Sequence, residues 1–171
     1  MSQPLLATAL RAALCAASLG WAATAAQATQ NYTILIGTCQ PANLLTLQFD
    51  LRLTNGAVRK AGRNPPSSLY FCDVPIDDLA VPSYNRMELQ FIDKDTTGNG
   101  HVVARLMRRN LQTGAAVEVA RASSVPSATL RTAGVSLSAP MDFRSHEYYV
   151  LVSLQAPVAE VEAHTVRFVT R

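Results

Sequence analysis

The stretch DKDTTGNG, residues 93–100, holds the side chains in this sequence that are best suited to metal chemistry. Asp93 and Asp95 are spaced by one residue and followed by glycines, and calcium prefers oxygen ligands of this kind. The glutamate that closes a helical calcium-binding loop is missing. The stretch also separates two alternating segments, and Asn99-Gly100 suits a turn with positive φ. Two interpretations therefore stay open: a calcium site at Asp93 and Asp95, or the tip of a β-hairpin.

The three histidines lack the spacing of known metal or catalytic motifs. His101, His146 and His164 form no H-x-H pattern with a following glutamate and no H-E-x-x-H. The alternation near the end of the chain predicts that His164 shares a strand face with Val166 and Phe168. The sequence therefore predicts no metal ligand and no general base among them.

Nucleophilic catalysis is not indicated, because the sequence has no G-x-S-x-G motif. A pair of carboxylates of the glycosidase type would have to come from Asp50, Glu88, Glu118 or Asp142. Each of these is predicted to lie on the solvated face of a strand or in a turn. We therefore predict a non-enzymatic binding or interaction module, without catalytic or cofactor-binding residues. A calcium-dependent carbohydrate-binding module or a hydrolase is the alternative.

Charge limits the choice of partner. The net charge is +3, and removal of Arg11 with the leader described below leaves +2, which is too small to indicate nucleic-acid binding. Arg105 and Arg109 lie four residues apart on one predicted strand face, with Arg86 expected nearby. They suit either an acidic partner or a charged edge that discourages strand pairing between molecules. The expected partner is an unknown protein or a surface glycan.

The N-terminal residues 1–28 have the order of a secretory signal peptide. Arg11 is followed by an apolar, alanine-rich run and then by Ala26-Gln27-Ala28. Cleavage after Ala28 would remove 28 of the 171 residues and leave 143. We expect a secreted or periplasmic protein with no stable membrane insertion after cleavage. An uncut leader that anchors the chain is the alternative.

Removal of the leader leaves two cysteines, Cys39 and Cys72. In an oxidising compartment these predict one disulfide. A loop of this size would constrain the unfolded chain by about 3–4 kcal/mol. Free thiols or a metal pair are the alternative, but neither a C-x-x-C motif nor a cysteine-histidine cluster supports it.

The mature chain alternates between apolar and polar residues over many short segments, as half-buried strands do. In residues 44–54, LLTLQFDLRLT, one face holds Leu45, Leu47, Phe49, Leu51 and Leu53, and the other holds Thr46, Gln48, Asp50 and Arg52. Asn55-Gly56 follows as a turn. The other alternating segments lie around residues 32–36, 87–91, 102–109, 117–119, 127–137, 148–155 and 166–168. No segment has the apolar periodicity of a long helix.

These segments predict an all-β fold, an antiparallel β-sandwich of about eight strands after a cleaved N-terminal signal peptide, and a jelly roll is one form that such a sandwich could take. Residues 29–171 would form one domain, and the proline-rich residues 60–85 a connection across the sandwich edge. A small outer-membrane β-barrel gives the same alternation, although such barrels typically end on an aromatic residue and this chain ends on Arg171. The tyrosine-rich strand near the end is similar to the last part of many small exported bacterial β-sandwich proteins.

Overall fold

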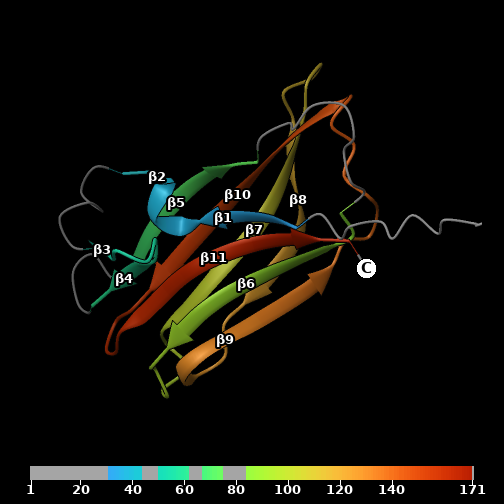
Figure 1. The fold of residues 1–171 in the computed structure, drawn as a ribbon. Coiled ribbons are helices and arrows are strands. Elements are labelled where there is room, and N and C mark those ends of the chain that lie inside the picture. Colours follow the sequence, from blue (N-terminus) through green and yellow to red (C-terminus); the bar gives the residue numbers. More distant parts are fainter. Residues whose placement is uncertain (1–30, 44–49, 62–66, 75–83, 171) are drawn as a thin grey trace, which may run out of the picture.

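The structure is a computed structural model that describes residues 31–43, 50–61, 67–74 and 84–170 (Figure 1). These residues form two antiparallel sheets that pack face to face. Their elements in chain order are β1 (Tyr32–Leu35), the short 3-10 helix η1 (Ile36–Thr38), β2 (Gln40–Pro41), β3 (Asp50–Arg52), β4 (Val58–Lys60), β5 (Ser67–Asp73), β6 (Arg86–Asp93), β7 (His101–Asn110), β8 (Ala116–Ser123), β9 (Ser127–Ser136), β10 (His146–Gln155) and β11 (Val161–Val169).

Each sheet is organised around one of the last two strands. The β11 sheet has the order β3-β4-β11-β6-β9, and β1 also pairs with β11. The β10 sheet has the order β2-β5-β10-β7-β8. From β5 to β11 most consecutive strands lie in opposite sheets, as in jelly-roll connections. The predicted antiparallel β-sandwich is confirmed.

The core lies between the sheets and is built by the predicted alternation. The inward residues of β6, β7 and β10 are almost completely buried: Met87, Leu89, Phe91, Val102, Ala104, Leu106, Tyr148, Val150, Val152 and Leu154. Their outward neighbours stay partly exposed, apart from Val103 and Glu88. Since burial of apolar side chains drives folding, these strands position everything else in the domain.

The alternation predicted for residues 44–54 is wrong in its described part, because Leu51 is 57% exposed and the Asp50 side chain points inward. The reason is that Asp50 lies directly opposite Lys60 in the β3–β4 pair, and both side chains are enclosed by the sandwich. Residues 44–49 lie outside the described part of the chain. The predicted turn at Asn55-Gly56 joins β3 to β4, with Gly56 at a φ of 79°.

The proline-rich connection of residues 60–85 contains a strand that the alternation did not reveal. β5 forms seven residues of it and pairs with β10 over its whole length. The short strands β2 and β4, together with β5, raise the number of described strands above the expected eight. The interruption by prolines and serines made this segment look like a crossing loop.

His164 does not share a face with Val166 and Phe168, contrary to the prediction. The β6–β11 register shifts between Ala163 and Thr165, which marks a β-bulge. The extra residue reverses the alternation, so that His164 lies beside Glu162 on the outer face while Val166 and Phe168 are completely buried.

The predicted leader, including Cys15 and Ala28, lies outside the described residues. Within the described ranges, no helix has the length and apolar character that a membrane span requires.

Candidate binding site

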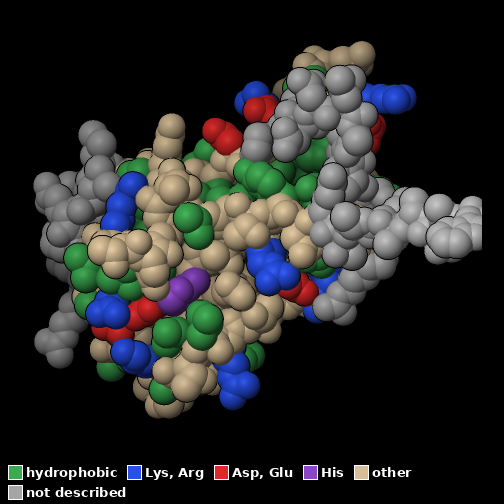
Figure 2. Space-filling view, viewed as in Figure 1, with side chains coloured by type: hydrophobic (Ala, Val, Ile, Leu, Met, Phe, Trp, Pro, Cys, Tyr) green, Lys and Arg blue, Asp and Glu red, His purple; other side chains and the backbone are tan. Residues whose placement is uncertain are grey.

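The outer face of the β11 sheet carries charges that are already paired with one another (Figure 2). Glu162 is bonded to the Arg59 guanidinium at 2.8 Å and to His164 Nε2 at 3.0 Å. Further along the face, Arg86 Nε donates to Glu88 at 3.1 Å, and Arg167 lies 3.7 Å from the same carboxylate. Arg59 and Glu162 neutralise each other, and the second group has only one positive charge in excess, so these groups leave a small net potential for a charged ligand.

The three arginines that were expected to lie close together, Arg86, Arg105 and Arg109, are divided between the two sheets. Arg105 and Arg109 share the outer face of the β10 sheet, where they pair with Glu118 and Glu147. Arg86 lies in the β11 sheet, so the expected line of three arginines does not form, because β6 and β7 belong to different sheets.

The four candidate carboxylates do not form a catalytic pair. Asp50 is enclosed between the sheets, whereas Glu88 and Glu118 lie on the outer faces of opposite sheets. The Arg121 guanidinium, bonded to Glu118, holds the pKa of that carboxyl below its ordinary value. The expectation that Asp50 is solvated is therefore wrong.

Asp142, the fourth carboxylate, caps a turn before β10. Its carboxylate accepts hydrogen bonds from the Ser145 hydroxyl and the Arg144 backbone N–H, and these lower the pKa of Asp142. Ser145 Oγ also lies 2.7 Å from His146 Nδ1. In a serine hydrolase the histidine lies between the serine and the acid. Here the serine is in the middle, which is the arrangement of a turn.

Residues 93–100 connect β6 of one sheet to β7 of the other, so this loop is a crossover between sheets and the hairpin interpretation is wrong. The positive φ occurs at Gly98, at 78°, rather than at Asn99-Gly100. Gly100 instead allows a close approach, because a Cβ atom there would lie 2.5 Å from Asp95 Oδ2.

The two carboxylates of this loop are buried and hydrogen-bonded to the chain. Asp93 accepts from the Asp95 backbone N–H at 3.1 Å and from the Ser124 hydroxyl, which in turn accepts from the Val102 backbone N–H at 2.8 Å. Asp95 Oδ1 accepts from the hydroxyl and the backbone N–H of Thr97, and these bonds lower the pKa of Asp95.

The calcium interpretation at Asp93 and Asp95 stays a prediction. Asp95 Oδ2 is a buried oxygen without a hydrogen-bond partner. Calcium needs six or more oxygens, and in the described part of the chain no three histidine, cysteine or acidic residues are grouped so that they could hold a metal ion.

A groove opens at the edge of the sandwich where β1 of the β11 sheet faces β5 of the β10 sheet. Its cavity volume is about 360 Å³, within the usual size of small-ligand sites. The lining residues come from three segments: Tyr32, Thr33, Ile34 and Leu35; Thr38, Cys39 and Gln40; and Phe71, Cys72 and Asp73. Within the described part of the chain, the groove therefore combines rings, hydroxyl groups, one amide and one carboxylate, and no arginine or lysine lines it.

Phe71 lies where the groove meets the outer face of the β10 sheet. Its ring stacks on Tyr149, with centroids 4.7 Å apart and an angle of 21° between the planes. Leu69 and Leu151 neighbour this pair on the same face, because they alternate with the inward residues of β5 and β10. This platform of Phe71, Tyr149, Leu69 and Leu151 is half-buried, and partly exposed apolar clusters are typical of binding surfaces.

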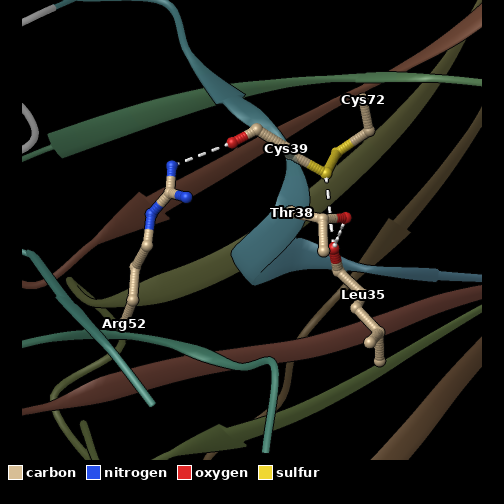
Figure 3. Close-up of a disulfide and its surroundings, with 5 residues drawn as sticks. All are labelled: Leu35, Thr38, Cys39, Arg52 and Cys72. Carbon is tan, nitrogen blue, oxygen red and sulfur yellow. Dashed lines mark hydrogen bonds between the residues drawn. A yellow bond between two sulfur atoms is a disulfide. The ribbon is translucent and has the colours of Figure 1, made fainter. Parts of the chain in front are cut away.

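The Cys39–Cys72 disulfide confirms the predicted pairing (Figure 3), and both cysteines line the groove. It joins the end of η1 to β5 with a Cα–Cα distance of 4.7 Å. Arg52 donates to the Cys39 carbonyl at 3.1 Å, and the Thr38 hydroxyl donates to the Leu35 carbonyl at 2.8 Å. The two walls of the groove are thus held together covalently.

Sequence reasoning missed the groove residues Gln40, Phe71 and Asp73. The available signal was their position beside the cysteines, since Gln40 follows Cys39 and Phe71 and Asp73 flank Cys72. The predicted disulfide already implied that these three residues would lie near one another.

Comparison with known proteins supports the fold. No protein-family model matches the sequence, and no curated protein is significantly similar to it. Among solved structures, a family two carbohydrate esterase from Cellvibrio japonicus is similar with a TM-score of 0.50 and 11% identity, covering 84% of this chain and 34% of the esterase. The chain therefore spans about a third of the length of that enzyme.

Two carbohydrate-binding modules are more distant in structure. One, from Clostridium stercorarium in complex with cellobiose, has a TM-score of 0.46 and 11% identity, with 82% of this chain and 94% of the module covered. The other, a family 11 module from Clostridium thermocellum in complex with a mixed-linked tetrasaccharide, has a TM-score of 0.42 and 7% identity, with 82% and 83% covered. At such identities the likeness concerns the fold alone.

Proposed function

We propose that this protein is a non-catalytic binding module, and that the groove between β1 and β5 takes a short segment of a surface glycan. The observation that carries the proposal is the composition of the groove, with the Phe71 ring at its mouth and hydroxyl, amide and carboxylate groups along its walls.

Sugars present apolar C–H faces and a ring of hydroxyl groups, so their sites pair an aromatic surface with a few polar side chains. Thr33, Thr38 and Gln40 are exposed and supply neutral donors and acceptors, and Asp73 supplies a strong acceptor. Among the described residues that line the groove there is no arginine or lysine, which disfavours a strongly anionic ligand. A neutral glycan fits this chemistry better than an acidic one.

The disulfide gives this site its rigidity. Because the link fixes the two walls before any ligand arrives, little conformational entropy is lost on binding. The stacked Tyr149 restrains the Phe71 ring in the same way. A preformed groove is the property expected of a module that binds without chemical turnover.

Binding to a panel of neutral and acidic oligosaccharides, measured by isothermal titration calorimetry, tests the proposal. We expect one class of neutral oligosaccharide to bind and Phe71→Ala to weaken it by at least about tenfold. Leu130→Ala, an exposed apolar residue on β9, is the matched control and should bind normally. If the Phe71→Ala protein binds as tightly as the wild type, the glycan does not bind in this groove. If the wild type binds none of the oligosaccharides, the proposal that the ligand is a glycan is rejected.

We further propose that the chain is exported, with cleavage after Ala28, and that residues 29–171 form a single domain. The leader composition and the disulfide support this proposal, since disulfides form in oxidising compartments. N-terminal sequencing of the protein recovered from the host would show Thr29 as its first residue. Recovery of the chain with its leader intact would contradict the proposal.

A further inference from the structure

The β3–β4 hairpin places a lysine and an aspartate against each other inside the sandwich. Asp50 and Lys60 are directly opposite in the antiparallel register, so their side chains lie on the same face. Their side chains are 1% and 0% exposed, and Lys60 Nζ lies 3.1 Å from Asp50 Oδ1. This is the separation of two groups in direct contact.

A third polar group reaches the pair from the opposite sheet. Tyr70 on β5 is completely buried, and its hydroxyl donates to Asp50 Oδ2 at 2.7 Å. The two oxygens of the carboxylate are therefore distinguished, because Oδ1 faces the lysine and Oδ2 faces the phenol.

The surroundings make an ammonium at Lys60 costly. Val58, Ile36 and Val161, all completely buried, belong to the core at this end of the sandwich. Within the described residues the lysine has one hydrogen-bond partner, Asp50, although an ammonium carries three donors. A buried ion pair gains less than it loses in hydration unless its remaining donors are satisfied.

We propose that Lys60 and Asp50 condense into an intramolecular amide, an isopeptide bond that joins β3 to β4 inside the core. One ammonium proton passes from Nζ to Oδ1, which lies 3.1 Å away, and the neutral amine then attacks Cγ of Asp50. The bond between Cγ and Oδ1 breaks, and Oδ1 leaves as water with two of the three protons that the ammonium carried. The third proton stays on the amide nitrogen. No oxidant, reductant or further reactant is required.

Tyr70 is placed to assist this reaction. Attack on Cγ moves negative charge onto Oδ2, and a donor already aimed at that oxygen stabilises the tetrahedral intermediate. Oδ2 then becomes the amide carbonyl oxygen and keeps the same hydrogen bond. The product replaces a buried ion pair by a neutral amide in an enclosed site from which water is excluded.

The mass of the wild-type protein tests this proposal without any mutation. After denaturation and reduction of the disulfide, we expect an intact mass lower than that of the sequence by one water. Trypsin cannot cleave after an acylated lysine, so the digest should contain residues 60–63 joined to the peptide that ends at Arg52. Asn55-Gly56 falls in the separate peptide 53–59, so modification of that turn cannot mimic the link. A mass equal to that of the sequence, with complete cleavage after Lys60, would overturn the proposal.

Three variants test the chemistry. Lys60→Met has no nucleophile and should keep the full mass of its sequence. Asp50→Asn should lose ammonia instead of water and give the same linked peptide as the wild type. Tyr70→Phe should leave part of the protein without the link, since the phenol stabilises the intermediate. If Lys60→Met protein shows the same mass deficit as the wild type, the deficit arises elsewhere and the assignment is wrong.

Discussion

The Tyr70 hydroxyl donates a 2.7 Å hydrogen bond to Asp50 Oδ2, and the two residues belong to opposite sheets. Burial, and next the hydrogen bond to Asp50, raise the pKa of Tyr70 above its ordinary value of 10.0. The phenol therefore stays protonated in the folded protein and links the sheets as a neutral donor.

High pH is expected to unfold the protein through Tyr70. The phenol ionises near pH 10 in the unfolded chain but resists ionisation in the folded one. The stabilisation that the protonated Tyr70 phenol gives to the folded protein is therefore complete below about pH 10 and is lost as the pH rises above that value. Urea unfolding at neutral and alkaline pH should show this loss in the wild type. Tyr70→Phe should lower the free energy of unfolding by about 1–3 kcal/mol at neutral pH. The stability of this variant should then fall less than that of the wild type as the pH becomes alkaline.

Tyr149→Phe is the matched control for this experiment, because Tyr149 is half-exposed on the outer face of the same sheet. It should unfold with the alkaline profile of the wild type. If Tyr70→Phe has that same profile, the raised pKa of Tyr70 does not govern alkaline unfolding.

Loss of the disulfide should destabilise the domain without changing its fold. The bond between Cys39 and Cys72 spans 33 positions of the chain, and its removal releases about 3–4 kcal/mol of unfolded-state entropy. The double variant Cys39→Ser, Cys72→Ser should unfold at a lower urea concentration than the oxidised wild type. Its urea midpoint should equal that of the wild type measured in reductant. Equal midpoints for oxidised and reduced protein would contradict this expectation.

Two glycines in tight surroundings should respond differently to alanine. At Gly100 the new Cβ would lie 2.5 Å from Oδ2 and 2.7 Å from Cβ of Asp95, a short side chain held by buried hydrogen bonds. At Gly134 it would meet the end of the Arg86 side chain, which can move. We expect Gly100→Ala to cost about 1–3 kcal/mol and Gly134→Ala less than about 1 kcal/mol. Thermal unfolding of both variants measures the difference, and the reverse order would show that Arg86 is the more rigid neighbour.

Calcium is expected to leave the melting temperature unchanged. Both oxygens of Asp93 and one of Asp95 already accept hydrogen bonds from the chain, and a calcium ion would have to displace these donors. Melting curves with calcium and with a chelator measure the effect. A rise in melting temperature that Asp95→Asn abolishes would instead establish the calcium site predicted from the sequence.

Alternation alone predicted which side chains of β6, β7 and β10 are buried, because the period of two assigns each residue to a face. It could not predict which strands pair. The crossover at residues 93–100 therefore resembled a hairpin, and Arg86 was expected near Arg105. The orientation of Asp50 was missed because it depends on Lys60 and Tyr70, two partners that only the folded chain brings together.

The candidate binding site could be predicted from the sequence less completely than the fold. The cysteine pair was predicted from composition and compartment, and both cysteines line the groove. The walls come from β1, η1 and β5, and the β5 segment had been taken for a loop. The outward residues Leu69 and Phe71 of β5 are as apolar as its inward residues Tyr70 and Cys72, so no alternation marks this strand. For this reason Phe71 and Asp73 could not be assigned to a surface.

The position of β11 has a consequence for how this domain acquires its structure. The strand latest in the chain lies between β6 on one side and β1 and β4 on the other. A growing polypeptide therefore cannot complete that sheet until β11 has been synthesised, and until then β1, β4 and β6 keep the edges that β11 will cover open.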